Sequence, residues 1–148
     1  MAVFRFRMQN ILEMKEKLEE QAKNEFAHAQ RALAEEEELL NALFQKKEAY
    51  IEQGIQLRNR VIDIQEIMDN KKAIEHTDML IEQQKLSVAV AGKKVDAATK
   101  QLMDARVQTK TYSKLREKEF NDFLAEEARK ESKEIDERQW QHDIYLAE

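Results

Sequence analysis

The side chains that most often carry catalysis or bind metals are few and scattered in this sequence. Its three histidines, His28, His76 and His142, lie far apart, and there is no cysteine. A zinc site needs histidine, cysteine or carboxylate ligands at short characteristic spacings, and none of these histidines has such neighbours. We therefore expect no metal site and interpret each histidine as a surface residue.

Other catalytic patterns are missing as well. The two glycines, Gly54 and Gly92, are isolated on helical stretches, so they predict no phosphate-binding loop. Carboxylates are abundant, but nothing in their spacing indicates a cleft that would shift their pKa values. We predict a protein that is not an enzyme and holds no cofactor. The net charge of −5 argues against general nucleic-acid binding, which depends on neutralising phosphates.

The composition favours long helices over a compact globular domain. The 148 residues include no proline and two glycines, so the usual breaks between short elements are missing. Charged residues make up 37% of the chain, which long helices tolerate and a compact core does not. No apolar run is long enough to span a membrane, and the amino terminus lacks the apolar core of a signal peptide. We expect a cytoplasmic protein.

A seven-residue repeat dominates residues 67–102. A branched aliphatic side chain occupies every seventh position, and the position three residues further on is small or polar. This spacing predicts one seam of a coiled coil, with the small residues allowing close approach of a partner helix. The first set is Ile67, Ile74, Ile81, Val88, Val95 and Leu102, and the second is Asn70, Thr77, Gln84, Ala91, Ala98 and Ala105.

The first third of the chain predicts the partner helix. Phe4, Met8, Ile11, Leu18 and Ala22 share one face, the pattern slips near residue 26, and alternating steps of three and four then continue. The slip resembles a stutter, which changes supercoiling without ending a helix. The acidic residues 35–38 read as a solvated face. The later positions are Phe26, Ala29, Leu33, Glu36, Leu40, Leu43, Lys47, Tyr50, Gly54, Leu57, Val61, Ile64 and Met68.

A turn before Asp63 completes the predicted fold. Asp63 can cap the next helix and Glu66 can reach back to it, as in a capping box, although a turn near Gly54 or residues 69–70 stays open. We predict an all-α fold, a long antiparallel two-helix coiled-coil hairpin forming a single domain over residues 1–148. Helix 1 covers about residues 3–58, the turn 59–62 and helix 2 about 63–145. Phe4 then lies near Glu117, and the last thirty residues have no partner helix.

Two surface features could bind partners. Residues 93–118 carry eight basic and three acidic side chains, a local excess of five positive charges. This stretch could be offset by acidic residues of helix 1, or it could face an acidic protein ring or an anionic membrane. Met79, Leu80, Leu86 and Val90 lie off the seam and predict a binding groove or self-association.

Three segments resemble the FliJ family of flagellar export proteins. The start, FRFRMQNIL, is similar to the aromatic–basic opening of that family, and LIEQQKLSV at residues 80–88 is similar to the middle of its second helix. The ending SKLREKEFNDFLAEEARKESKEIDER, residues 113–138, resembles the family's Lys/Glu-rich ending, which closes on an acidic pair, here Asp136 and Glu137.

The resemblance implies a rod similar to the stalk of rotary ATPases, working in the flagellar type III export apparatus. Its implied partners are the hexameric export ATPase FliI, the membrane export gate protein FlhA and export chaperones, so it would associate peripherally with the cell membrane at the flagellar base. For the ATPase ring it implies Phe4, Arg5, Phe6, Arg7, Phe120, Phe123, Asp136 and Glu137. For the export gate it implies Leu43, Tyr50, Leu80 and Gln84.

Two other functions fit the same residues. A homo-oligomeric coiled-coil spacer would use the seam and the outward apolar residues to associate with itself. A holdase-type chaperone would use those apolar residues to bind unfolded chains. The stalk, the spacer and the holdase differ in their oligomeric state and in their effect on an ATPase.

Overall fold

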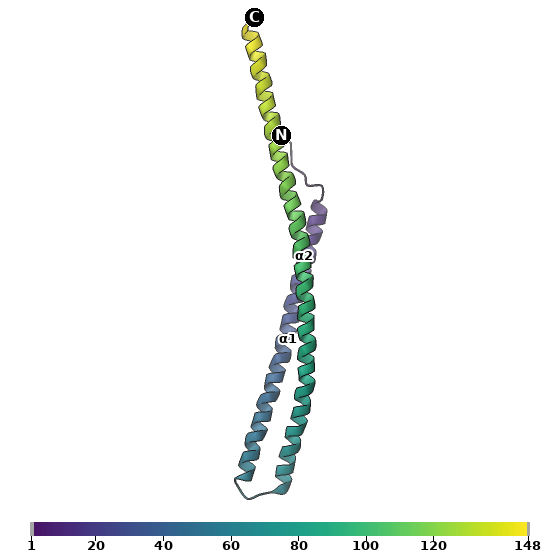
Figure 1. Cartoon of the computed structure of the whole chain (residues 1–148), viewed down its shortest axis with the longest axis vertical. Helices are drawn as coiled ribbons and strands as arrows, with labels where there is room; N and C mark the ends of the chain where they lie inside the picture. Colours follow the sequence, from purple (N-terminus) through teal and green to yellow (C-terminus); the bar gives the residue numbers. More distant parts are fainter. Residues whose placement is uncertain (1, 148) are drawn as a thin grey trace. The chain divides into compact units, whose positions relative to one another are not determined.

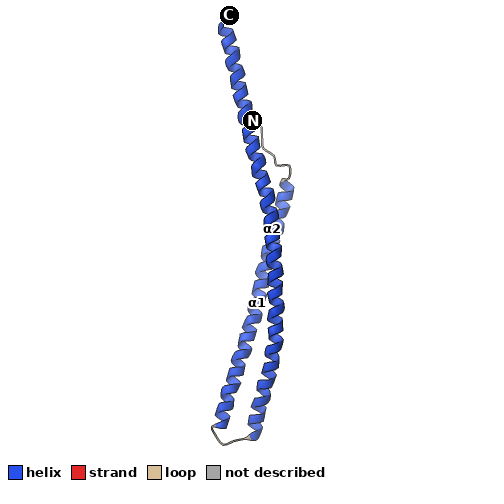
Figure 2. Cartoon of the chain, viewed as in Figure 1, coloured by secondary structure: helices blue, strands red, loops and turns tan. Residues whose placement is uncertain are grey.

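Two long helices make up nearly all of the protein in a computed structural model that describes residues 2–147 (Figure 1). Helix α1 is Gln9–Arg58 and helix α2 is Ile64–Ala147. Figure 2 shows only helix and irregular chain between residues 2 and 147, with no strand. The all-α prediction is confirmed.

The chain divides into two compact units, which we describe separately. The terminal unit combines the described residues up to Glu20 with those from Met103 onward, and the hairpin unit is Gln21–Leu102. The expectation of one domain over residues 1–148 stays a prediction.

Each unit pairs α1 with α2 in antiparallel order. In the terminal unit, Lys15 Nζ donates to Gln108 Oε1 at 2.7 Å, and Arg116 Nε donates to Gln9 Oε1 at 3.1 Å. In the hairpin unit, Lys47 Nζ lies 2.7 Å from Asp78 Oδ1. A later position on α1 therefore faces an earlier position on α2, which confirms the antiparallel hairpin.

The seven-residue seam of α2 is confirmed by burial. Every position of the two predicted sets is buried or half-buried, and none is exposed. Ile81 and Leu102 are 3% and 5% exposed, and the small residues at the alternate positions are buried with them. Such small side chains let two helices approach closely, so this face of α2 forms the core of the hairpin unit.

The inner face of α1 differs from the prediction near its start. Leu18, expected on the seam, is 44% exposed, whereas Glu19 is half-buried. The predicted slip near residue 26 is wrong, because the steps of three and four run without a break. The unbroken pattern was hard to recognise in the sequence, because several inner positions hold long charged side chains. Their methylene stems can lie in a seam while their charged ends reach water. The inner positions are Met8, Leu12, Lys15, Glu19, Ala22, Phe26, Ala29, Leu33, Glu36, Leu40, Leu43, Lys47, Tyr50, Gly54 and Leu57.

The amino-terminal segment is not helical, so the predicted helix start at about residue 3 is wrong. Residues 2–6 have no regular secondary structure, residues 7–8 turn, and α1 begins at Gln9. Phe4 is half-buried and Phe6 is 8% exposed, whereas Arg5 and Arg7 are exposed. Alternation of buried and exposed side chains is typical of extended chain. We call residues 2–8 the N-terminal strap.

The turn between the helices covers residues 59–63 and ends at the predicted cap. Asp63 Oδ1 accepts a hydrogen bond from Gln65 N at 3.0 Å, so Asp63 caps α2 as expected. The second half of the capping box is wrong. Glu66 forms an ion pair with Arg60, a residue of the turn. An arginine within reach offers this carboxylate a stronger partner than a backbone amide. The predicted seam of helix 1 continued beyond Leu57 to Val61, Ile64 and Met68. These three residues are exposed, because α1 ends at Arg58.

Candidate partner-binding surfaces

The terminal unit gathers three of the aromatic residues implied for the ATPase ring. The Phe4 ring meets Phe120 edge to face at 5.2 Å between ring centroids, and it meets Phe123 at 5.5 Å with a tilt of 48°. The Arg116 guanidinium lies 5.7 Å from the Phe4 ring centroid, within reach of a cation–π interaction. We call Phe4, Arg116, Phe120 and Phe123 the aromatic cluster. Phe4 therefore lies beyond Glu117, its expected neighbour, by three to six positions.

The extended strap explains this offset. An extended chain advances about 3.3 Å per residue and a helix about 1.5 Å, so each strap residue passes about two residues of α2. Gln9 pairs with Arg116, Phe4 meets Phe120 and Phe123, and Ala2 shares a shallow hollow with Glu127, Lys130, Glu131 and Glu134. The strap thus follows part of the segment that the sequence left without a partner (Figure 1).

The strap has an inner and an outer face. Phe4 and Phe6 point into the unit, and the charged side chains of Arg5 and Arg7 are exposed. Of the four strap residues implied for the ring, only the arginines are therefore free to meet a partner while the strap is docked. Phe120, 39% exposed, keeps part of its ring open.

Opposing terms act on strap docking. Burial of Phe6 and the two aromatic pairs of Phe4 favour the docked strap. The entropy lost by ordering the backbone of residues 2–6 opposes it.

Asp136 and Glu137 do not join the aromatic cluster. Asp136 follows Phe123 by 13 residues on α2 (136 − 123), which is about 20 Å of helix. Every residue from 128 to 147 is exposed, among them Ile135 at 57% and Trp140 at 66%. At the start of this stretch, Arg129 Nη2 donates a hydrogen bond to Glu126 Oε1 at 2.7 Å, and this bond lowers the pKa of the Glu126 carboxyl.

The four residues implied for the export gate lie in the hairpin unit, and all are half-buried. Leu43 and Tyr50 are inner positions of α1, and Gln84 is a seam position of α2. The Gln84 amide donates to the Glu36 carbonyl oxygen at 2.9 Å and to the Glu36 carboxylate. Glu36 is therefore not part of a fully solvated acidic face, since Gln84 ties it into the seam. Leu80 lies beside the seam and is less exposed than the outward apolar residues.

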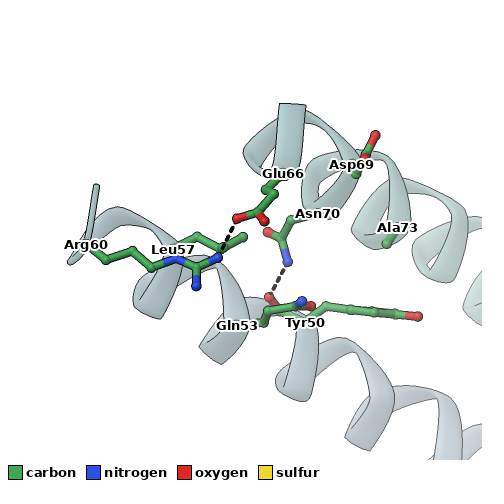
Figure 3. Close-up of a pocket in the computed structure, with 8 residues that line it drawn as sticks. All are labelled: Tyr50, Gln53, Leu57, Arg60, Glu66, Asp69, Asn70 and Ala73. Carbon is green, nitrogen blue, oxygen red and sulfur yellow. Dashed lines mark hydrogen bonds and ion pairs between the residues drawn. The ribbon is translucent and has the colours of Figure 1, made fainter. Parts of the chain in front are cut away.

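A polar layer lies between the helices near the turn (Figure 3). Asn70, 8% exposed, donates from Nδ2 to the Tyr50 carbonyl oxygen at 2.8 Å. Gly54 makes this possible, because a Cβ at residue 54 would lie 2.7 Å from Asn70 Oδ1. The hollow drawn in Figure 3 is lined by Tyr50, Gln53, Leu57, Arg60, Glu66, Asp69, Asn70 and Ala73.

The outward apolar residues of the hairpin unit are exposed as expected. Met79, Leu86 and Val90 are 52%, 70% and 53% exposed. Leu86 and Val90 line a shallow hollow whose other wall is formed by α1 residues Ala32 and Glu36. On α1, Phe44, Ile51 and Ile55 form a second exposed apolar stripe, each more than 40% exposed. This stripe was not predicted from the sequence.

The basic stretch 93–118 lies on the surface. All eight basic side chains are exposed. Among the described residues, one of them pairs directly with a carboxylate of α1, Arg106 with Glu19 at 3.8 Å. The other seven therefore make no direct ion pair with a described residue of α1.

Residues 2–147 contain neither a metal-site candidate nor a candidate membrane span. No cluster of three or more histidine or acidic side chains there could hold a metal ion. Neither helix has a stretch that is apolar enough for its length to cross a bilayer.

Sequence reasoning missed Ala2, Arg116 and the pairing of Gly54 with Asn70. The alternation Phe4–Arg5–Phe6–Arg7 was the available signal for an extended strap, because its period is two. Asn70 on a seam was a second signal, since a buried polar residue there needs a partner.

The chain matches a family model and resembles known proteins. A family model described as "FliJ: Flagellar FliJ protein" matches residues 4–142. The Flagellar FliJ protein of Bacillus subtilis (strain 168) is 25% identical over 136 residues, which cover 90% of each chain. Among solved structures, the Chlamydia trachomatis protein CT670, described as a YscO homolog, is 24% identical, covers 99% of each chain and has a TM-score of 0.45.

Proposed function

The chain belongs to the FliJ family, and from this premise we propose that it is a non-enzymatic rod of the flagellar type III export apparatus. In this proposal it binds and activates the hexameric export ATPase, as the stalk of a rotary ATPase does. The observation that carries the proposal is the family match over residues 4–142, which includes residues 4–8 of the strap and residues 128–142 of the exposed end of α2.

The terminal unit supports a role in ring binding. It presents Arg5 and Arg7 on the outer face of the strap and an exposed helical stretch from residue 128 to 147. A stalk inside a ring needs an exposed side-chain surface and no catalytic pocket. We assign the ring contact to Arg5, Arg7, Phe120, Asp136 and Glu137, with Phe4, Phe6 and Phe123 holding the strap.

The hairpin unit provides the second half of the proposal. We assign contact with the export gate protein and with export chaperones to the apolar surface around Leu43, Tyr50, Leu80 and Gln84. Exposed apolar residues next to these positions enlarge that surface. The protein would then work in the cytoplasm and associate peripherally with the membrane through the gate.

Reversing the charge of the strap arginines tests the ring contact. Both side chains are exposed, so Arg5→Glu with Arg7→Glu should leave the helical content unchanged. We expect the wild-type chain, added below one copy per ring, to raise the steady-state ATPase rate of the purified export ATPase, and the variant to lose at least four-fifths of this stimulation.

The matched control is Lys23→Glu with Arg31→Glu, which makes the same charge change on exposed positions of α1 in the hairpin unit. It should stimulate the ATPase as the wild type does. A wild-type chain that changed neither the rate nor the assembly of the ATPase would overturn the proposal.

The exposed apolar side chains of the hairpin unit favour one other candidate, a self-associating spacer. Light scattering at micromolar concentration distinguishes the two functions. The stalk predicts a mass near the 17.5 kDa of one chain, and the spacer predicts a stable multiple of it. A holdase would instead suppress the aggregation of an unfolded test protein at equimolar ratio, which the stalk proposal does not predict.

A further inference from the structure

We propose that the N-terminal strap is a latch: it docks reversibly on α2 and thereby covers and uncovers Arg116, Phe120 and Phe123 for the ATPase ring. The identity of the partner, the export ATPase ring, rests on the proposed function. Docking of the strap on α2 does not depend on it, because both segments belong to the terminal unit of this chain.

The attachment of the strap is made by side chains. Phe4 contacts Phe120, Phe123 and Arg116, and Phe6 is buried. Among the described residues, no hydrogen bond joins the backbone of residues 2–8 to α2. The nearest backbone bond, from Gln9 N to the Phe6 carbonyl oxygen at 3.1 Å, closes the turn into α1. The strap can therefore leave α2 without breaking a backbone hydrogen bond to that helix.

Arg116 connects the latch to the start of α1. Its guanidinium lies over the Phe4 ring, and its Nε donates to Gln9 Oε1 at 3.1 Å. When the strap leaves, Arg116 keeps its bond to Gln9 but loses the aromatic face. A cationic group and two phenylalanine rings then become available together on one surface of α2.

Release changes what a partner meets. With the strap docked, the partner meets two arginines and part of the Phe120 ring. With the strap released, it meets the full faces of Phe120 and Phe123. Aromatic and arginine side chains are enriched at the energetic centres of protein interfaces, so the released form should bind the ring more tightly.

Cross-linking measures the docked state, since the chain has no native cysteine to interfere. Ala2→Cys and Glu131→Cys place thiols around one hollow and leave every aromatic contact intact. A short bismaleimide should link this pair. It should not link Ala2→Cys with Tyr145→Cys, which lies 14 residues (145 − 131), about 21 Å, further along α2.

Removing the Phe4 ring tests what holds the strap. Phe4→Ala should lower the cross-linking rate of the first pair at least fivefold. Phe44→Ala, which removes a partly exposed phenylalanine of the hairpin unit, should not change it. An unchanged rate in Phe4→Ala would overturn the latch.

Locking the strap tests release. Phe120→Trp in a Trp140→Phe background gives one tryptophan beside Phe4. Acrylamide should quench it at least twofold more strongly in the open protein than in the cross-linked protein. Equal quenching would overturn reversible release.

The locked and open proteins then separate the latch from the proposed function. We expect the cross-linked chain to bind the export ATPase at least fivefold more weakly than the same double-cysteine chain with its thiols capped singly. Equal binding would overturn the regulatory role of the strap. Absence of binding in both forms would overturn the proposed function, and the quenching ratio would then decide the latch on its own.

Discussion

At the scale of single residues, the two glycines have different roles although both lie inside helices. Gly54 leaves room for the buried Asn70 amide, whereas a Cβ at Gly92 would meet nothing within 4 Å. Glycine in a helix interior costs about 1 kcal/mol relative to alanine. Only at Gly54 does the structure contain a reason to accept that cost.

Gly54→Ala and Gly92→Ala should therefore have opposite effects on stability. We expect Gly92→Ala to raise the free energy of unfolding by about 1 kcal/mol, since only helix propensity changes. Gly54→Ala should lower it by about 1–3 kcal/mol, because the new Cβ displaces Asn70 from the Tyr50 carbonyl group and leaves buried polar groups unpaired.

Urea unfolding followed by circular dichroism measures both changes. In an Asn70→Ala background the clash is absent, and Gly54→Ala should then stabilise the protein as Gly92→Ala does. Destabilisation by Gly54→Ala in that background would show that the amide is not the cause.

Ile81 is the most deeply buried branched aliphatic side chain of the α2 seam, at 3% exposed. Ile81→Asp loses a buried apolar side chain, worth about 2–5 kcal/mol, and places a carboxylate without a partner in the seam. We expect the cooperative thermal transition to disappear or to shift down by at least 10 °C. Leu86→Asp, at a position 70% exposed, is the control and should shift the midpoint by little. A melting curve unchanged by Ile81→Asp would contradict the assignment of this seam.

At the scale of the elements, the cap of α2 is held by one side chain. Asp63 Oδ1 accepts from Gln65 N, and Asp63→Ala removes this bond. We expect a loss of about 0.5–2 kcal/mol in the free energy of unfolding. Asp63→Ser keeps a capping oxygen and should recover most of that loss. Equal destabilisation by the two variants would show that the cap contributes nothing.

The seam of α2 could be predicted because branched side chains repeat every seven residues. Such a repeat reflects which positions are buried, so it can be recognised without knowing the partner helix. The prediction failed on α1 at Glu19, which occupies an inner position where Leu18 was expected, since the burial of Glu19 depends on a partner from α2. The prediction also failed at the strap, because the spacing of apolar side chains in residues 4–7 is compatible both with the apolar face of a helix and with the alternation of an extended chain. The contacts with Phe120 and Phe123 decide between these two, and they lie more than one hundred residues away in the chain.

The implied site residues were predictable to different degrees. Exposure of Arg5, Arg7, Asp136 and Glu137 follows from charge alone. The inward direction of Phe4 and Phe6 depends on the conformation of the strap, and the Gln84 bond to Glu36 depends on the register of the hairpin unit. Both depend on how two distant segments pack against each other. Neither the inward direction of the phenylalanines nor the Gln84–Glu36 hydrogen bond could therefore be predicted from one segment of the sequence.

At the scale of the whole molecule, the two functions assigned to the chain fall in different units, each with its own packing. The hairpin unit has a continuous seam with buried residues along α2. In the terminal unit, α2 continues past its contacts with α1 into the stretch 128–147, where no residue is buried and where the strap reaches only the hollow at Ala2. Stability should therefore be uneven along α2.

Hydrogen exchange should reveal this gradient. A helix without a partner is marginal in water, so backbone amides at residues 130–147 should exchange at least a hundredfold faster than those at residues 74–102. Addition of the export ATPase should slow exchange in residues 130–147 if this stretch enters the ring, because ordering would then accompany binding. Slowing confined to the hairpin unit would move the ring contact away from Asp136 and Glu137. Uniform protection along α2 in the free protein would instead show that the exposed stretch is stable without any partner.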